Sequence, residues 1–237
     1  MDYDYIRENL SNVHENIETA CSKSGREADS VKLIAVSKTK PFEDLLSAYN
    51  AGERIFGENK VQEICSKYER IGELPGAVFH LIGHLQTNKV RQVIDKVAMI
   101  HSVDSLHLAQ AIDKEAARSG RIMDVLIEVN VAEEESKFGI SCDEAEDLVR
   151  ECAKLHNIHV CGLMTIAPFV ENSEENRHYF KKLKQLCVDL KAKNIDNTDM
   201  DVLSMGMTGD YQVAIEEGAT MVRVGTGIFG ARNYNVQ

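Results

Sequence analysis

Two hydrophobic patterns follow one another along the chain. Near the start, apolar side chains recur at three- and four-residue steps: Ile6, Leu10, Val13, Ile17 and Ala20. This spacing predicts an amphipathic helix over residues 2–24 that ends near Gly25. From residue 31 onward, short apolar runs rich in β-branched residues alternate with segments of helical periodicity, which is typical of buried strands in a parallel sheet.

Eight of these runs are predicted to be strands: residues 31–38, 54–57, 77–82, 97–103, 124–131, 158–166, 201–205 and 221–225. Helices are predicted between them, including residues 88–95, 105–118, 143–155, 173–193 and 209–217. Regular alternation of strand and helix indicates an α/β fold with a parallel sheet. An open doubly wound sheet is the competing architecture. Because eight strands are predicted, each followed by a helix or helical turn, we favour a (β/α)8 TIM barrel with an extra N-terminal helix. No composition break divides residues 1–237, so we expect a single domain.

Composition narrows the classes of partner. The 237 residues carry a formal net charge of −11, which argues against a nucleic-acid surface. Six cysteines include no C-x-x-C pair, and we interpret them as reduced thiols of a cytoplasmic protein. The N-terminus lacks the pattern of a signal peptide, and no apolar run is long enough for a membrane span. His80 and His84 lie across a strand end and a turn, so we expect no metal site there.

Lys38 closes the first predicted strand. Side chains alternate along a strand, so Lys38 shares a face with the apolar residues Ile34 and Val36. Most lysines at such positions point into solvent. A lysine held against apolar walls instead loses its proton more easily and can attack a carbonyl carbon. The strand pattern by itself leaves both interpretations open.

The segments after the last two predicted strands combine glycines with hydroxyl side chains. Residues 204–210 read SMGMTGD and residues 225–230 read GTGIFG. Glycines let backbone N–H groups approach an anion, and (β/α)8 barrels often bind phosphate after strands seven and eight. Residues 225–230 also match the G-x-G-x-x-G dinucleotide motif. That motif requires a further βαβ unit and a later acidic residue, which the seven remaining residues do not provide.

Arg223 lies inside the last predicted strand, in register with Gly225, and is expected to face the barrel interior near its mouth. A buried guanidinium needs a partner, which could be a carboxylate, a ring nitrogen or a phosphate. A lysine on the first strand, an arginine on the eighth and a phosphate-binding loop pair between them together indicate a pyridoxal phosphate (PLP) site.

Longer blocks fall in one order along nearly the whole chain: residues 36–41 (VSKTKP), 56–59 (FGEN), 80–89 (HLIGHLQTNK), 101–104 (HSVD), 136–140 (SKFGI), 162–164 (GLM), 204–210 and 223–232. Together they resemble the pyridoxal phosphate homeostasis protein family. The resemblance implies a barrel of PLP fold type III, like the N-terminal domain of alanine racemase. It also implies that Lys38 carries PLP as an internal aldimine and that Arg223 lies near the pyridine nitrogen.

The same resemblance implies further binding residues: Ser204, Thr208, Gly225 and Thr226 around the phosphate, with Asn59 and Met205 lining the pocket. Thr208 departs slightly from the family pattern, in which many members have serine. Since the hydroxyl is kept, the departure leaves the expected phosphate contact intact.

Three functions fit such a site. The first is a monomeric PLP carrier or regulator that serves intracellular PLP homeostasis and supplies PLP-dependent apoenzymes, without catalytic turnover. The second is an amino-acid racemase, which needs two acid–base groups on opposite faces of the bound substrate. In alanine racemases one of them is a tyrosine from an extra C-terminal domain that this sequence lacks, and an arginine at the ring nitrogen weakens the electron sink. The third is a Schiff-base aldolase, which would show no chromophore without substrate. We favour the carrier.

Overall fold

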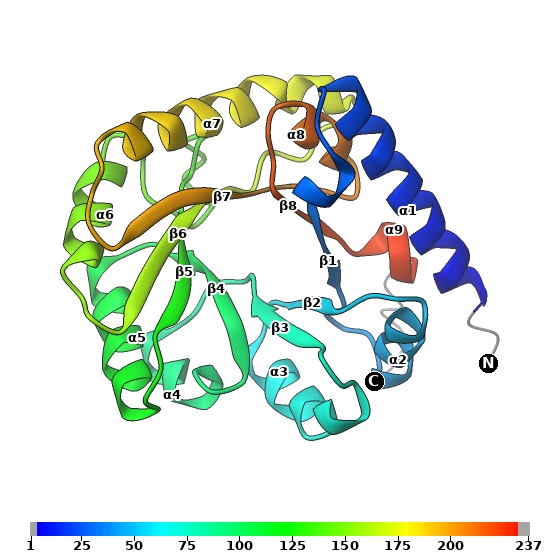
Figure 1. Cartoon of the computed structure of the whole chain (residues 1–237), viewed down its shortest axis with the longest axis horizontal. Helices are drawn as coiled ribbons and strands as arrows, with labels where there is room; N and C mark the ends of the chain where they lie inside the picture. The colour runs from blue at the N-terminus through cyan, green and yellow to red at the C-terminus, as the bar shows by residue number, and fades with distance from the viewer. Residues whose placement is uncertain (1–3, 232–237) are drawn as a thin grey trace.

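The structure is a computed structural model that describes residues 4–231. Its strands are parallel and close into a barrel in chain order, with the last strand paired to the first (Figure 1). The strands are β1 (Lys32–Val36), β2 (Ile55–Glu58), β3 (Val78–Leu81), β4 (Val97–Val103), β5 (Met123–Glu128), β6 (Ile158–Met164), β7 (Thr198–Met207) and β8 (Met221–Val224). The predicted (β/α)8 barrel is confirmed, and the open sheet is excluded because β1 and β8 are hydrogen-bonded neighbours.

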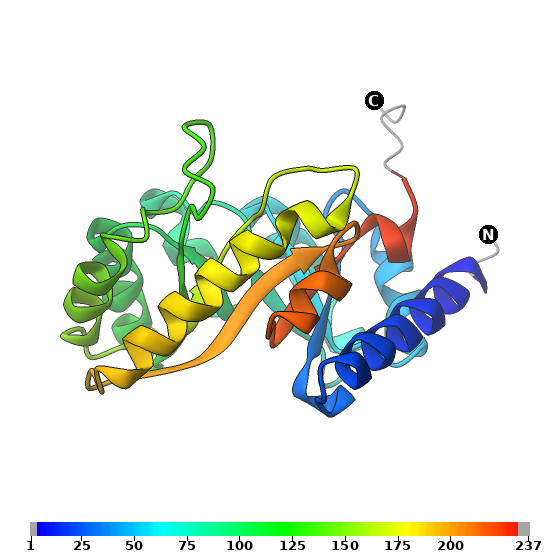
Figure 2. The ribbon, with the colours of Figure 1, turned by 90° about the horizontal axis from the view of Figure 1, so that it is seen from above.

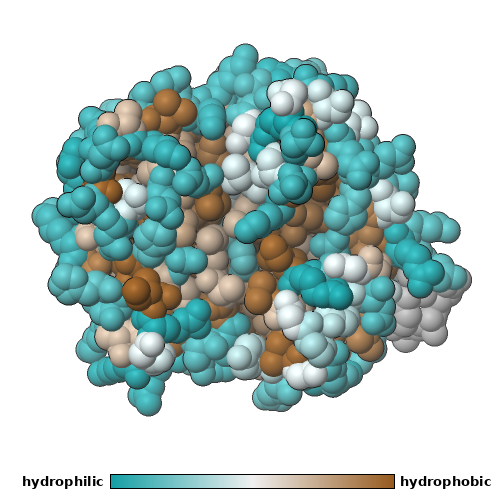
Figure 3. Space-filling model, viewed as in Figure 1, coloured by the Kyte–Doolittle hydropathy of each residue, from teal (hydrophilic) through white to brown (hydrophobic). Residues whose placement is uncertain are grey.

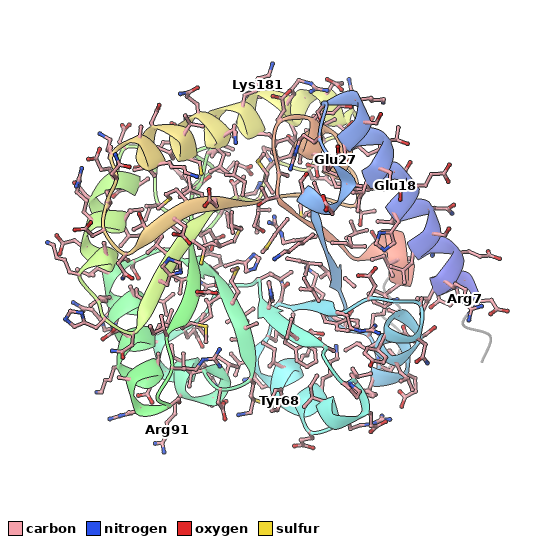
Figure 4. All side chains as sticks on the ribbon, viewed as in Figure 1. Arg7, Glu18, Glu27, Tyr68, Arg91 and Lys181 are labelled. Atoms are coloured by element: carbon pink, nitrogen blue, oxygen red, sulfur yellow. The ribbon has the colours of Figure 1, made fainter. Side chains whose placement is uncertain are left out.

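Helices surround the barrel (Figure 1). They are α1 (Asp4–Lys23), α2 (Phe42–Asn50), α3 (Val61–Tyr68), α4 (Val90–Val93), α5 (Leu106–Arg118), α6 (Ala145–Ala153), α7 (Arg177–Ala192), α8 (Tyr211–Glu216) and α9 (Thr226–Phe229). The predicted leading helix is α1, which packs against α2, α8 and α9. Figure 4 shows labelled polar side chains such as Arg7, Glu18 and Lys181 pointing outward from this layer, away from the barrel.

Side-chain alternation divides the apolar residues into two layers. On β1, Leu33 and Ala35 face outward and join the large core between barrel and helices. Ile34 and Val36 face inward and belong to a separate cluster inside the barrel: Ile34, Val36, Ile82, Met99, Leu126, Cys161, Met164 and Met221. The predicted alternation along the first strand is therefore confirmed, and the barrel interior is a packed core.

Element boundaries differ from the predicted ones where tertiary contacts override local pattern. β1 ends at Val36, since the chain turns at Thr39, which has φ +64°, so Lys38 lies in the turn after the strand. The predicted helix 88–95 is a 3-10 turn, Thr87–Lys89, followed by the short α4. A 3-10 turn, Ser173–Asn176, likewise precedes α7, and Asn172 caps it through a hydrogen bond from the Glu174 N–H. β7 begins three residues earlier than predicted because Thr198 pairs with β6.

The two ends of the barrel differ in shape. Figure 2 shows the segments that follow β5 and β6 rising on one side, where the carboxyl ends of the strands lie, and the loop between α7 and β7 on the opposite side. In Figure 3, hydrophobic residues lie across the middle of the face shown and hydrophilic residues surround them. All six cysteines are free thiols. Within residues 4–231, no helix combines the length and apolar character needed to cross a membrane.

Candidate functional site

A cavity of about 470 Å³ lies at the carboxyl ends of the strands. Its lining groups are cationic (Lys38, Lys40, Arg223), hydroxyl, amide or glycine (Asn59, Thr208, Gly209, Gly225, Thr226) and apolar (Val36, Ile82, Ile166, Phe169), among others. The size suits a cofactor or other small ligand. The cavity lies where (β/α)8 barrels place their functional sites.

The charge of the cavity is opposite to that of the whole chain. Three cationic side chains line it, against one carboxylate, Asp210. The two oxygens of Asp210 already accept hydrogen bonds, one from the Met207 N–H at 2.6 Å and one from Asn176 Nδ2 at 2.8 Å. A positively lined cavity in a protein of net charge −11 is suited to an anionic ligand.

A buried polar network holds the backbone just before Lys38. Ser37 Oγ donates to Glu58 Oε1 at 2.6 Å. Lys67, reaching in from α3, donates to the same Glu58 oxygen at 2.6 Å and to the Ser37 carbonyl at 2.8 Å. Side-chain exposure is 8% for Lys67 and 0% for Glu58, so water hardly competes for these bonds. The network therefore fixes where the Lys38 side chain begins.

The backbone just after Lys38 is held as well. The Thr39 N–H donates to Glu63 Oε2 at 2.6 Å, which stabilises the positive φ of Thr39. Lys40 Nζ donates to the carbonyl oxygens of Phe229 and Ala231, at 2.6 and 3.1 Å, and so ties this turn to the segment after β8. Lys40 is thus engaged with backbone carbonyls at the cavity edge.

The charged form of Glu58 is disfavoured by burial. Burial raises the pKa of Glu58, and the attraction of Lys67 offsets this only in part. Among the described residues, Glu58 Oε2 has no hydrogen-bond partner. Sequence reasoning missed this pair, although a signal existed: Lys67 follows Val61 and Ile64 on the apolar stripe of α3, and a charge on a buried stripe needs a partner.

Arg223 faces the barrel interior and lines the cavity, as predicted. Its Nη1 donates to Ser204 Oγ at 2.6 Å and its Nη2 to the Thr165 carbonyl at 2.8 Å. Burial lowers the pKa of Arg223 to about 10, against the opposing charges of Asp210 and Glu128. The guanidinium therefore remains protonated at neutral pH, and its hydrogen-bond partners are neutral oxygens.

A chain of buried groups extends from Arg223 into the barrel. Ser204 Oγ lies 3.0 Å from His101 Nδ1, and His101 Nε2 lies 2.9 Å from His80 Nδ1. Burial lowers the pKa of His80 to about 4 and that of His101 well below its usual value, so both rings are neutral. Since Arg223 can only donate, the natural order of donors is Arg223 to Ser204, Ser204 to His101 and His101 to His80.

The structure places two of the predicted binding residues outside the cavity lining. Ser204 does not line the cavity, because its buried hydroxyl is shared by Arg223 and His101. Met205 is fully buried in the outer apolar core, since alternation along β7 turns it away from the interior. Six other predicted residues do line the cavity: Lys38, Asn59, Thr208, Arg223, Gly225 and Thr226. Their roles in holding a cofactor stay predictions.

The two glycine-hydroxyl segments dock against each other. Thr208 Oγ1 accepts hydrogen bonds from the N–H groups of Gly225 and Gly227, both at 3.3 Å. A Cβ on Gly227 would lie 3.1 Å from Thr208 Cγ2, so a side chain there would push the two segments apart. The two segments together form one wall of the cavity, and their contact with a phosphate stays a prediction.

Glu128 is a second buried carboxylate that sequence reasoning missed. It lies at the carboxyl end of β5, and burial together with the charge of Asp104 raises its pKa to about 7, while Arg223 opposes the rise. Its Oε2 has no hydrogen-bond partner among the described residues. The signal was the alternation along β5, which puts Glu128 on the inward side with Leu126.

Comparison with known proteins defines the class first. Residues 9–233 match the family model described as "Alanine racemase, N-terminal domain". A protein of Bifidobacterium adolescentis whose structure is titled as that of an unknown protein has 38% sequence identity and a TM-score of 0.90, with 97% of each chain covered. The barrel and its cavity thus belong to the alanine racemase-like class.

Two named relatives narrow the class to one family. The pyridoxal phosphate homeostasis protein of Aquifex aeolicus is 46% identical over 227 residues, covering 96% of this chain and 98% of the relative. PipY of Synechococcus elongatus, solved with PLP bound, is 33% identical with a TM-score of 0.83, covering 95% of this chain and 100% of PipY. The chain belongs to the pyridoxal phosphate homeostasis protein family.

Proposed function

We propose that this chain binds PLP covalently through Lys38 and serves intracellular PLP homeostasis without catalytic turnover. The observation that carries the proposal is a cationic cavity with a half-buried lysine on a turn fixed from both sides. Curated relatives carry the name pyridoxal phosphate homeostasis protein, and the PipY structure contains PLP, which supports the same ligand here.

The residues present fit this cofactor. The hydroxyls of Thr208 and Thr226 provide neutral donors for a phosphate at one wall of the cavity, and Gly225 has no side chain to obstruct its approach. Arg223 presents a fixed cation toward the cavity and suits a ring nitrogen that carries no proton. When bound, PLP supplies an aldehyde whose carbon bonds to Lys38 Nζ with loss of one water.

The surroundings of Arg223 support a carrier over a racemase. A racemase uses a protonated ring nitrogen, which a carboxylate stabilises and a guanidinium opposes. It also needs a second acid–base group, and no tyrosine is among the described residues that line the cavity. Tyr211, on the helix after β7, is buried in the outer core and cannot supply one.

The cavity mouth suits exchange of the cofactor with other proteins. Phe169 is 96% exposed at the mouth, and Ile166 and Met207 beside it are also exposed. Exposed apolar side chains around a cavity offer contacts to a recipient protein. We therefore include PLP-dependent apoenzymes among the proposed partners.

Spectroscopy and isotope exchange together test this function. The purified protein should show a visible absorption band with PLP that borohydride removes, whereas an aldolase would show none before substrate is added. In deuterium oxide, the PLP-loaded protein should exchange no α-protons of the proteinogenic amino acids. Steady exchange or racemisation of any of them, at rates typical of enzymes, would contradict the carrier function and support the racemase function.

A further inference from the structure

Three metal-ligating side chains meet at the end of the barrel opposite the cavity. Asp124 is the second residue of β5, and His159 and Cys161 are the second and fourth residues of β6. Each offers one ligand atom, and these atoms all lie within 4.8 Å of one another. No sequence spacing indicates the group, because 35 positions separate Asp124 from His159 in the chain. We propose that Asp124, His159 and Cys161 bind one Zn²⁺ ion, with water as the fourth ligand.

Strand register builds this group. Asp124 and His159 are direct partners in the β5–β6 ladder, so their side chains leave the barrel wall side by side. Between Val125 and Leu126 the register shifts, which leaves Cys161 as the extra residue of a bulge on β6. Because of this extra residue, Cys161 and Met164, three positions apart, both face inward.

The backbone is specialised around the bulge. Gly162 has φ +157°, and a Cβ there would lie 1.9 Å from the Val202 carbonyl oxygen, so only glycine fits. On β7, Met200 has φ +54°, which is rare for a large side chain. The β6–β7 register also shifts between Val160 and Gly162. This second register shift flanks Cys161 on β6, the strand that carries two of the three side chains.

The distances agree with tetrahedral coordination. His159 Nδ1 lies 3.3 Å from Asp124 Oδ1 and 3.5 Å from Cys161 Sγ. With ordinary zinc–ligand lengths, a tetrahedral site has an N···O edge of about 3.4 Å and an N···S edge of about 3.6 Å. One nitrogen, one sulfur and one oxygen form a donor set that zinc prefers to magnesium or calcium.

The neighbouring groups favour a cation. Asp199 Oδ2 lies 3.4 Å from His159 Nε2, on the far side of the ring. A carboxylate in this position keeps the proton on Nε2 and leaves the Nδ1 lone pair for a metal. Cys161 is 7% exposed, whereas the side chains of His159 and Asp124 are 27% and 48% exposed. The thiol is thus protected while a metal ion, and the water that completes its coordination, can enter from solvent.

The competing arrangement is an ion pair without metal, in which a protonated His159 bridges Asp124 and Asp199. The two arrangements differ in whether Cys161 Sγ keeps its proton. When Zn²⁺ binds, a bond between Cys161 Sγ and the metal replaces the S–H bond, and the thiol proton passes to solvent. In the ion pair, the thiol keeps its proton and plays no necessary part. Cobalt reports this difference, since it takes tetrahedral nitrogen and sulfur sites and absorbs visible light.

The experiment is a titration of the purified protein with Co²⁺, followed by displacement with Zn²⁺, in buffer free of chelators and thiols. We expect one ion per chain, strong visible bands of tetrahedral cobalt, a thiolate charge-transfer band in the near ultraviolet, and loss of both on adding zinc. Cys161→Ser should abolish the charge-transfer band. It should also weaken zinc binding more than about 100-fold, because loss of even an outer partner weakens metal binding by about 10–100-fold.

Further variants distinguish loss of metal binding at this site from general effects on folding. Asp199→Asn should weaken zinc binding by about 10–100-fold without removing the charge-transfer band. Two matched controls, Cys65→Ser and His156→Gln, should leave both properties unchanged. Thermal melting followed by circular dichroism shows that each variant is folded. Weak octahedral cobalt spectra, or a cobalt spectrum that is the same in folded Cys161→Ser, would overturn the proposal.

Discussion

Lys67→Met removes the cation from the buried pair that anchors the turn carrying Lys38. In the wild type, Lys67 Nζ lies 2.6 Å from Glu58 Oε1 and 2.8 Å from the Ser37 carbonyl. Methionine fills a similar volume but leaves Glu58 buried without its counter-ion. Removing one member of a buried pair typically costs about 3–5 kcal/mol of the free energy of unfolding. For a chain of this size each kcal/mol lowers Tm by about 2–4 °C, so a fall of roughly 10 °C is expected.

The loss of stability caused by Lys67→Met is expected to increase with pH. Burial already raises the pKa of Glu58 above its unfolded value, so the folded state prefers the protonated carboxyl. Stability from this group is present below the unfolded pKa and is lost as the pH rises through the folded pKa. Without Lys67 the folded pKa rises further. The destabilisation by Lys67→Met should therefore be larger at pH 7 than at pH 5.

Urea unfolding followed by circular dichroism, at pH 7 and at pH 5, measures both effects. Lys60→Met, an exposed lysine at the start of α3, is the matched control and should change stability by less than about 0.5 kcal/mol. The double variant Glu58→Gln with Lys67→Met should recover part of the loss, because no charge is then buried. A cost below about 1 kcal/mol at pH 7, or an equal cost at both pH values, would refute this reasoning.

Two further predictions concern the cavity and the barrel interior. Because a hydrogen bond to a charged group contributes about 1.5–3 kcal/mol, Thr208→Val with Thr226→Val should weaken PLP binding by tenfold or more in equilibrium dialysis. Pyridoxal, which lacks the phosphate, should bind almost unchanged, and equal losses for both ligands would show that these hydroxyls do not contact the phosphate. Glu128 has a folded pKa raised to about 7, so it contributes stability that is lost as the pH rises through 7. Glu128→Gln should flatten this decline in urea unfolding between pH 5 and 8, and an unchanged slope would contradict the assignment.

The fold was predictable because its signals are local. Short apolar runs separated by segments of helical periodicity predict the barrel. Alternation along β8 turns Arg223 inward, and Lys38 lines the cavity from the turn that follows β1. The same rule, applied to β7, would have corrected the predicted site. Ser204 and Met205 are consecutive on a strand, so their side chains cannot both face the interior.

Other features depend on contacts that no local pattern specifies. The bulge at Cys161 and the shifted register of β6 against β7 arise from the pairing of three strands. The hydrogen bonds that join Arg223, Ser204 and His101 link three different strands across the barrel. A sequence shows that such groups are inside, since alternation does so, but their partners are determined only when the barrel closes.

Covalent binding of PLP through Lys38 is tested by locating the site of attachment in the chain. The PLP-loaded protein is reduced with borohydride, digested and mapped by mass spectrometry, with Lys40→Met as the matched control because Lys40 lines the same cavity two residues away. We expect the reduced adduct on Lys38, its persistence in Lys40→Met, and its loss together with the visible band in a folded Lys38→Ala variant. An adduct found mainly on Lys40, on Lys137 or on another lysine, or a band that survives in Lys38→Ala, would contradict it.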